Sequence, residues 1–230
     1  SVSLNGSINN RGYNSNNQLV NAGNITISTT NTATTTGVND GQVSGVITGG
    51  NFIKSGAGTF ILKSVNTYIG TTTVSGGTLQ LGSTNSIPTG TSLTVTSTLD
   101  LGGFNQQVSS LSGAGLITSS GSGTLVLTVS SGTYSGVLEN GTAGSVGLTK
   151  INTSQLTLSG SNTYTGPTLI TQGVLAVGHS NGLGASPQTT VSSGAALQLQ
   201  GGISIGALPL SLTGTGVSSG GALRNVSGNN

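Results

Sequence analysis

Residues 54–70 decide how this chain folds, because the chain repeats them: Lys54-Ser-Gly-Ala-Gly-Thr-Phe-Ile-Leu-Lys-Ser-Val-Asn-Thr-Tyr-Ile-Gly70. The second copy lies 96 residues later and reads Lys150-Ile-Asn-Thr-Ser-Gln-Leu-Thr-Leu-Ser-Gly-Ser-Asn-Thr-Tyr-Thr-Gly166. The match continues without insertion to Gly82 and Gly178, and with small shifts it covers nearly everything from about residue 41 onward. Self-similarity at a fixed spacing is typical of stacked supersecondary units. We therefore expect a repeat architecture.

Apolar residues alternate with polar ones at a spacing of two. Short segments such as Phe60-Ile-Leu62, Leu79-Gln-Leu81, Leu99-Asp-Leu101 and Leu175-Ala-Val177 show this pattern, and each is bounded by Gly, Ser, Asn or Pro. Alternation of this kind predicts strands with one face turned inward, and β-branched residues support strands over helices. The pattern predicts an all-β fold without significant α-helix. It places Phe60 and Leu62 inward and Ile61 outward.

Short one-sided strands can close a sandwich, a barrel or a solenoid. The long repeat, an aliphatic core and polar residues at nearly all other positions favour a parallel β-helix of about 20–24 residues per turn. Equivalent residues on successive turns then lie about 4.8 Å apart, so stacked like charges repel while Thr, Ser and Asn stack without cost. This architecture explains why charged residues make up only 3% of the chain.

The composition excludes several classes of protein. Charged residues are far below the roughly 25% usual in globular domains, but the mean hydropathy of +0.14 is too high for a disordered chain. Five Lys and Arg residues, dispersed along the chain, do not make a nucleic-acid surface despite a pI near 9.2. The chain has no cysteine and no apolar run long enough for a transmembrane helix, so we expect no membrane insertion of this segment.

Several stretches resemble a known family. They are Ser135-Gly-Val-Leu138, Gly147-Leu-Thr-Lys150, the second repeat copy from Leu156 to Gly166, and Gly173-Val-Leu175. Together they are similar to the autotransporter-associated β-strand repeat, or passenger-associated transport repeat, of bacterial type V secretion proteins. The resemblance implies a right-handed parallel β-helix that is exported through an outer-membrane translocator barrel to the cell surface.

The extent of the internal repeat and the resemblance together suggest how the chain is organised. Residues 1–40, rich in Asn and Thr, break the repeat and are expected to form divergent N-terminal rungs or a cap. Residues 41–230 are expected to continue them as one repeat-containing β-helix. The family pattern normally runs further, which indicates a fragment of a longer passenger.

The inventory of ionisable residues argues against an enzyme. Polysaccharide-cleaving β-helices need clustered carboxylates, often with calcium. Here the acids are separated by roughly 40 to 60 positions, which places them on different turns. We expect no catalytic residue, no cofactor and no metal site. We also expect Asp100 to point into solvent and His179 to lie in a solvated loop. The acids and the histidine are Asp40, Asp100, Glu139 and His179.

The tyrosines are the candidates for ligand contact. Tyr13, Tyr68, Tyr134 and Tyr164 lie beside Gly, Ser or Asn, an arrangement that could stack against glycans. A structural role is the alternative, since Tyr68 and Tyr164 recur in register. The repeated Asn66 and Asn162 are expected to be structural, each satisfying the backbone of a turn.

Three functions follow from these patterns. The first is a non-enzymatic passenger stalk that aids export and surface display. The second is an adhesin or self-association module that binds surface glycans, a host surface or like copies, because an almost uncharged surface repels little. The third is ice binding by Thr-x-Thr arrays, although these arrays do not recur on a regular spacing.

Overall fold

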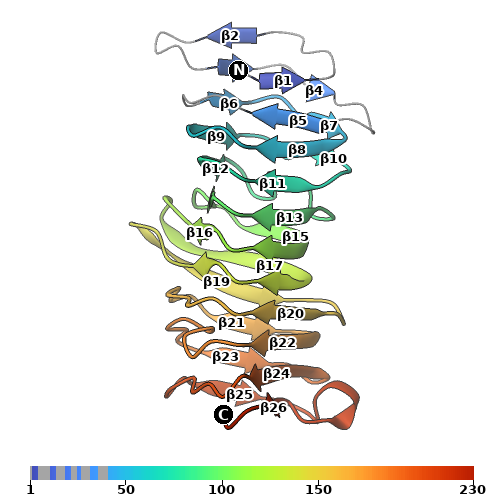
Figure 1. The fold of residues 1–230 in the computed structure, drawn as a ribbon, viewed down its shortest axis with the longest axis vertical. Coiled ribbons are helices and arrows are strands. Elements are labelled where there is room, and N and C mark those ends of the chain that lie inside the picture. Colours follow the sequence, from blue (N-terminus) through green and yellow to red (C-terminus); the bar gives the residue numbers. More distant parts are fainter. Residues whose placement is uncertain (1, 5–10, 14–18, 22–24, 27–31, 36–40) are drawn as a thin grey trace.

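The computed structural model describes residues 2–4, 11–13, 19–21, 25–26, 32–35 and 41–230, with side chains from residue 41 onward. The chain winds into an elongated column of turns stacked one on another, with the first strands at one end and β26 at the other (Figure 1). It makes about eight turns.

Each turn crosses three faces of the column in a fixed order. Face 1 contains β1 (Val2–Leu4), β5 (Thr32–Thr35), β8 (Asn51–Lys54), β11 (Thr72–Val74), β13 (Ser92–Val95), the second halves of β15 (Gln106–Gly113) and β17 (Gly123–Tyr134), β20 (Gln155–Leu158), β22 (Gly173–Val177), β24 (Ala195–Gln200) and β26 (Leu223–Ser227).

Face 2 contains β2 (Arg11–Tyr13), β3 (Leu19–Asn21), β6 (Gly41–Val43), β9 (Thr59–Leu62), β12 (Thr78–Leu81), β14 (Thr98–Asp100), β16 (Leu116–Thr118) and β18 (Val137–Leu138). Face 3 contains β4 (Ile25–Thr26), β7 (Ile47–Gly49), β10 (Thr67–Tyr68), the first halves of β15 and β17, β19 (Gly144–Lys150), β21 (Thr168–Ile170), β23 (Thr189–Val191) and β25 (Leu210–Leu212).

The strands pair with the strands one turn before and one turn after them. In the described ranges every pair is parallel except β1–β5 and β2–β3, which are antiparallel and lie within residues 1–40. In the parallel pairs the paired residues are 18 apart at the shortest, Ser92 with Ser110, and 27 apart at the longest, Gln200 with Ser227. The predicted parallel β-solenoid is confirmed. The turn length varies more than predicted, and the right-handed winding and the division at residue 40 stay predictions.

The described residues contain no α-helix and a single short 3-10 turn, Val217–Ser219. Most strands turn alternate side chains inward, as β9 illustrates: Phe60 and Leu62 are buried while Ile61 is half-buried on the outer side. The predicted register is therefore confirmed. Stacked on one another, the inward side chains form one narrow core along the column, and a second, smaller apolar cluster of Val174, Ala176 and Ala196 packs against Val217.

The first turns also bury aromatic rings, which a purely aliphatic core would not contain. The ring of Phe52 lies 6.1 Å from that of Phe60 and 6.0 Å from that of Tyr68. Ring pairs at this spacing contribute beyond their buried area. The aromatic group therefore adds to the packing at the N-terminal end of the described core.

The two repeat copies lie on different faces of the column. Four successive pairings carry Phe52 to Thr72, Leu93, Leu111 and Gly132, all on face 1. The residue 96 positions after Phe52 is Leu148, which lies two faces further along, on face 3. The repeat unit is thus four and two-thirds turns long, and its second copy is displaced by one face.

Candidate functional site

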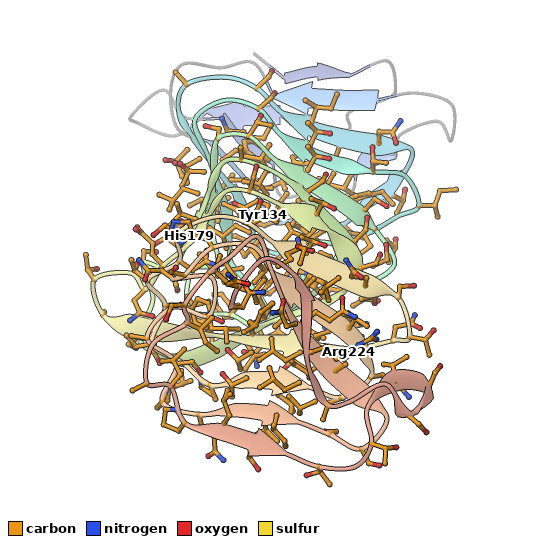
Figure 2. The ribbon with its side chains drawn as sticks, turned by 60° about the horizontal axis from the view of Figure 1, so that its bottom comes forward. Tyr134, His179 and Arg224 are labelled. Carbon is orange, nitrogen blue, oxygen red and sulfur yellow. The ribbon has the colours of Figure 1, made fainter. Side chains whose placement is uncertain are left out.

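Three of the four tyrosines lie in the core. Tyr68, Tyr134 and Tyr164 are 1%, 0% and 0% exposed, and Figure 2 shows Tyr134 within the stack of strands. Burial raises the pKa of each phenol above its usual range. A ring without exposed surface offers no face on which a glycan can stack. Tyr13 lies outside the residues whose side chains are described.

Each buried phenol has a hydrogen-bond partner. Tyr68 Oη lies 2.5 Å from Thr72 Oγ1, and its repeat counterpart Tyr164 Oη lies 2.8 Å from Thr168 Oγ1. In both copies the pair joins the end of one face to the strand on the next. A buried hydroxyl without a partner would cost about 1–3 kcal/mol, so these pairs explain why Tyr and Thr recur together.

Asn66 and Asn162 bridge three turns of the column. Asn66 Oδ1 accepts a hydrogen bond from Ile47 N (2.7 Å), one turn earlier, and Asn66 Nδ2 donates to Ser86 O (2.7 Å), one turn later. Asn162 Oδ1 accepts from Leu138 N (2.8 Å), and its Nδ2 donates to Gly182 O (2.7 Å). We propose that both residues are structural, because these bonds satisfy backbone groups that the ladder leaves open.

The repeat also buries two lysines that the sequence analysis did not single out as site residues. Lys54 is 2% exposed and Lys150 is 0% exposed, each at an inward position at the end of its strand. Burial lowers the pKa of Lys150 to about 8, which leaves the ammonium group largely charged at pH 7. The alternation within the strand predicts this burial, since Lys54 lies two residues after the inward Phe52 and so points to the same side.

The acidic residues lie closer together than their spacing in the sequence indicates. Asp100 pairs with Thr118 on face 2, and Glu139 N donates to Ile117 O. Asp100 and Glu139 therefore occupy equivalent positions two turns apart. They line a shallow cavity of about 360 Å³. The cavity is lined by Asp100, Thr118, Ser119, Ser120, Glu139, Asn140, Gly141 and Thr142.

Asp100 is not solvated as predicted, because it is only 7% exposed. It does point outward, but its carboxylate is covered by residues of neighbouring turns and accepts three hydrogen bonds. The donors are Gln80 Nε2 (2.7 Å), Gly102 N (2.8 Å) and Ser120 N (2.8 Å). The Asp100 carboxylate is thus engaged by the protein, which leaves Glu139 as the cavity's available carboxylate.

Few charges reach the surface of residues 41–230. With Lys54, Lys150 and Asp100 buried, the charged side chains with exposed area are Lys63, Glu139 and Arg224, and Figure 2 shows Arg224 at the C-terminal end of the column. His179 is half-buried, and its Nδ1 accepts a hydrogen bond from Asn181 N (3.0 Å).

Among the described residues, no group of three His, Cys, Asp or Glu side chains is placed to hold a metal ion. The same part of the chain contains no helix suited to spanning a membrane.

The fold and the repeated contacts define a parallel β-solenoid built from a recurring, hydrogen-bonded unit. The family model of the passenger-associated-transport-repeat matches residues 52–81, 117–142 and 148–177. The first and third matches are the two copies described above. The matches begin at Phe52 on face 1, Ile117 on face 2 and Leu148 on face 3, so the repeat is not confined to one face of the column.

A curated relative supports the same assignment. The Adhesin BmaC autotransporter of Brucella suis biovar 1 (strain 1330) is 37% identical over 155 residues, which cover 65% of this chain and 4% of that protein. No solved structure matches the chain. The chain carries passenger-associated-transport-repeats and is a distant homologue of this protein. It is a β-helix segment of an autotransporter passenger, a class whose location is at the cell surface or secreted.

Proposed function

We propose that this segment is a non-enzymatic stalk of a bacterial surface protein, which holds other regions of its polypeptide away from the outer membrane and aids their export. The observation that carries the proposal is the continuity of the column. One core runs from the first described side chains to the last turns, and buried Lys, Asn and Tyr side chains fasten the turns to one another. Such a rod provides length and stiffness without needing a ligand.

The segment passes unfolded through an outer-membrane translocator barrel and folds outside the cell, turn by turn. Parallel stacking suits this route, because each turn contacts mainly its two neighbours and can form once the preceding turn exists.

A display experiment tests the stalk. The chain is inserted between an epitope tag and a translocator barrel, and surface exposure of the tag is measured with antibodies. We expect display that depends on folding of the segment, so that a variant with a broken core lowers it while a surface variant such as Ile61→Thr does not. Equal display by a scrambled sequence of the same composition would contradict the proposal.

Adhesion is the second candidate, favoured by two observations. The relative is itself named an adhesin. In addition, the described surface carries few charges, so little electrostatic repulsion keeps copies of the chain apart. Self-association of this kind should be insensitive to ionic strength, because salt screens charges and the surface has few to screen.

Two experiments distinguish the possible ligands of an adhesin. Sedimentation of the purified chain in low and high salt tests whether the chain binds copies of itself. Concentration-dependent association that persists at both salt levels supports homotypic adhesion. For glycans, the candidate contact is the cavity beside Glu139, which offers a carboxylate and hydroxyl groups. Binding on a glycan array that is lost in Glu139→Gln but kept in Lys63→Gln would assign adhesion to this cavity.

A further inference from the structure

The two buried lysines occur where the column has a wide corner. Lys54 ends β8 and Thr59 begins β9, so residues 55–58 form the corner; Lys150 ends β19 and Gln155 begins β20, so residues 151–154 form the other. One turn after Lys150, Ile170 is followed by a corner of only residues 171–172. In these turns, a lysine accompanies a four-residue corner and an aliphatic residue accompanies a narrow one.

Backbone carbonyl groups of the wide corner point at the ammonium group. Lys150 Nζ donates to Ile151 O (2.5 Å), Asn152 O (2.6 Å) and Gln172 O (3.2 Å), the last on the following turn. Charge-assisted hydrogen bonds of this kind are about twice as strong as neutral ones. The ammonium group therefore draws the corner inward and joins it to the next turn.

The first copy repeats this arrangement in another place. Lys54 Nζ donates to Gly56 O and to Gly76 O (2.9 Å), and these acceptors lie 96 residues before Asn152 and Gln172. Lys54 donates hydrogen bonds at the corner between faces 1 and 2, whereas Lys150 donates them at the corner between faces 3 and 1. The arrangement thus depends on the corner and its lysine and not on the face.

In the part of the chain that the structure describes, no acidic side chain forms an ion pair with Lys150, and the exposed fraction of this lysine is 0%. Isolated charges are costly to bury unless they are solvated by the protein. The carbonyl dipoles of the corner and of the next turn take the place of water, as rings of carbonyl oxygens do around a dehydrated potassium ion.

We propose that the four-residue corner is a binding site for a monovalent cation of the ammonium type, and that the chain fills the site with its own lysine side chain. The stem of the lysine occupies the core position that Val or Ile takes elsewhere, and the ammonium group is the bound ion. Removing the lysine leaves inward carbonyl groups without a donor, whereas narrowing the corner removes the carbonyl groups themselves.

Three variants of the whole chain test the proposal by chemical denaturation. Lys150→Val leaves the wide corner without its cation. Lys150→Val with Asn152 and Thr153 deleted has the narrow corner that follows Ile170. Lys63→Val is the control, because Lys63 is exposed. We expect Lys150→Val to lower the folding equilibrium constant at least tenfold, the shortened variant to recover it to within about threefold, and the control to leave it unchanged.

A fourth variant, Lys150→Met, keeps the stem and tests the cation itself if Lys150→Val does not fold. Its stability is compared in ammonium chloride and tetramethylammonium chloride at equal ionic strength. We expect ammonium to stabilise Lys150→Met more than the unmodified chain, whose site is occupied. A shortened corner that folds no better than Lys150→Val, or no difference between the two salts for Lys150→Met, would overturn the proposal.

Discussion

The side-chain amide of Gln80 donates a hydrogen bond of 2.7 Å to the carboxylate of Asp100, which stands directly below it on the next turn. The same carboxylate also accepts from Gly102 N and Ser120 N, so it holds together the chain on three successive turns. An acidic residue in this nearly uncharged chain is therefore part of the scaffold.

We expect Asp100→Ala to destabilise the chain by about 2–3 kcal/mol, because three donors lose an acceptor and hydrogen bonds to charged groups contribute about 1.5–3 kcal/mol. Asp100→Asn keeps one oxygen acceptor and should lose less. Urea denaturation followed by circular dichroism measures both. If Asp100→Ala is as stable as the unmodified chain, the carboxylate does not hold these turns together.

Gly136 marks a corner where successive turns approach too closely for a side chain. A Cβ atom there would lie 2.1 Å from Gly115 O on the preceding turn and 2.6 Å from the phenol end of Tyr134. We expect Gly136→Ala to cost about 2 kcal/mol or more, since overpacked positions typically lose about 1–3 kcal/mol. Gly90→Ala is the matched control, because a Cβ at Gly90 would meet nothing within 4 Å. Thermal denaturation compares the two variants.

Much of this fold could be predicted from the sequence because each turn of a solenoid is specified by short, local sequence patterns. Alternation alone places Phe60 and Leu62 inward, and repetition of the pattern implies stacking. The face on which a motif lies could not be predicted in this way. It depends on the summed lengths of all the turns, which range from 18 to 27 residues, so small local differences move Lys150 to a different face from Lys54.

The candidate site was less predictable for a related reason. Alternation indicates which way a side chain points but not what covers it. Asp100 points outward and is nevertheless buried, because Gln80 and Ser120 on adjacent turns close over it. Tyr68 and Tyr164 lie in polar stretches, yet their rings fill the core and only the hydroxyl groups need the polar neighbours.

Asn162 should be far more important for stability than a neighbouring amide of the same type. Asn162→Ala removes an acceptor for Leu138 N and a donor for Gly182 O, both buried, so we expect a loss of about 2 kcal/mol or more. Asn181→Ala removes only an exposed contact with Ser161 Oγ and should change stability by less than about 0.5 kcal/mol. Equal stabilities of the two variants would argue against the structural role proposed for Asn162.

Two threonines at equivalent positions of adjacent turns should respond to substitution by valine with opposite changes in stability. Thr168 and Thr189 are paired on adjacent turns of face 3 and are both buried. Thr168 Oγ1 bonds to Tyr164 Oη, whereas Thr189 Oγ1 has no partner among the described residues. We expect Thr189→Val to stabilise the chain by about 1 kcal/mol and Thr168→Val to destabilise it by about 1–2 kcal/mol. Denaturation curves showing the same sign for both would refute this.

Alkaline pH should weaken the fold. Burial raises the pKa of Tyr68, Tyr134 and Tyr164, so above pH 10 the folded chain holds protons that the unfolded chain has lost, and stability falls.

The steepness of the fall reports the number of buried tyrosines. Each fully ionised group in the unfolded chain contributes about 1.4 kcal/mol per pH unit, so three give about 4 kcal/mol per unit near pH 11. Tyr164→Phe should reduce that slope by about one third, whatever it does to stability at neutral pH. Urea midpoints measured from pH 8 to 12 give the slope, and tyrosinate absorbance should appear together with unfolding. Ionisation of these phenols in the folded chain near pH 10 would show that their rings are accessible to solvent.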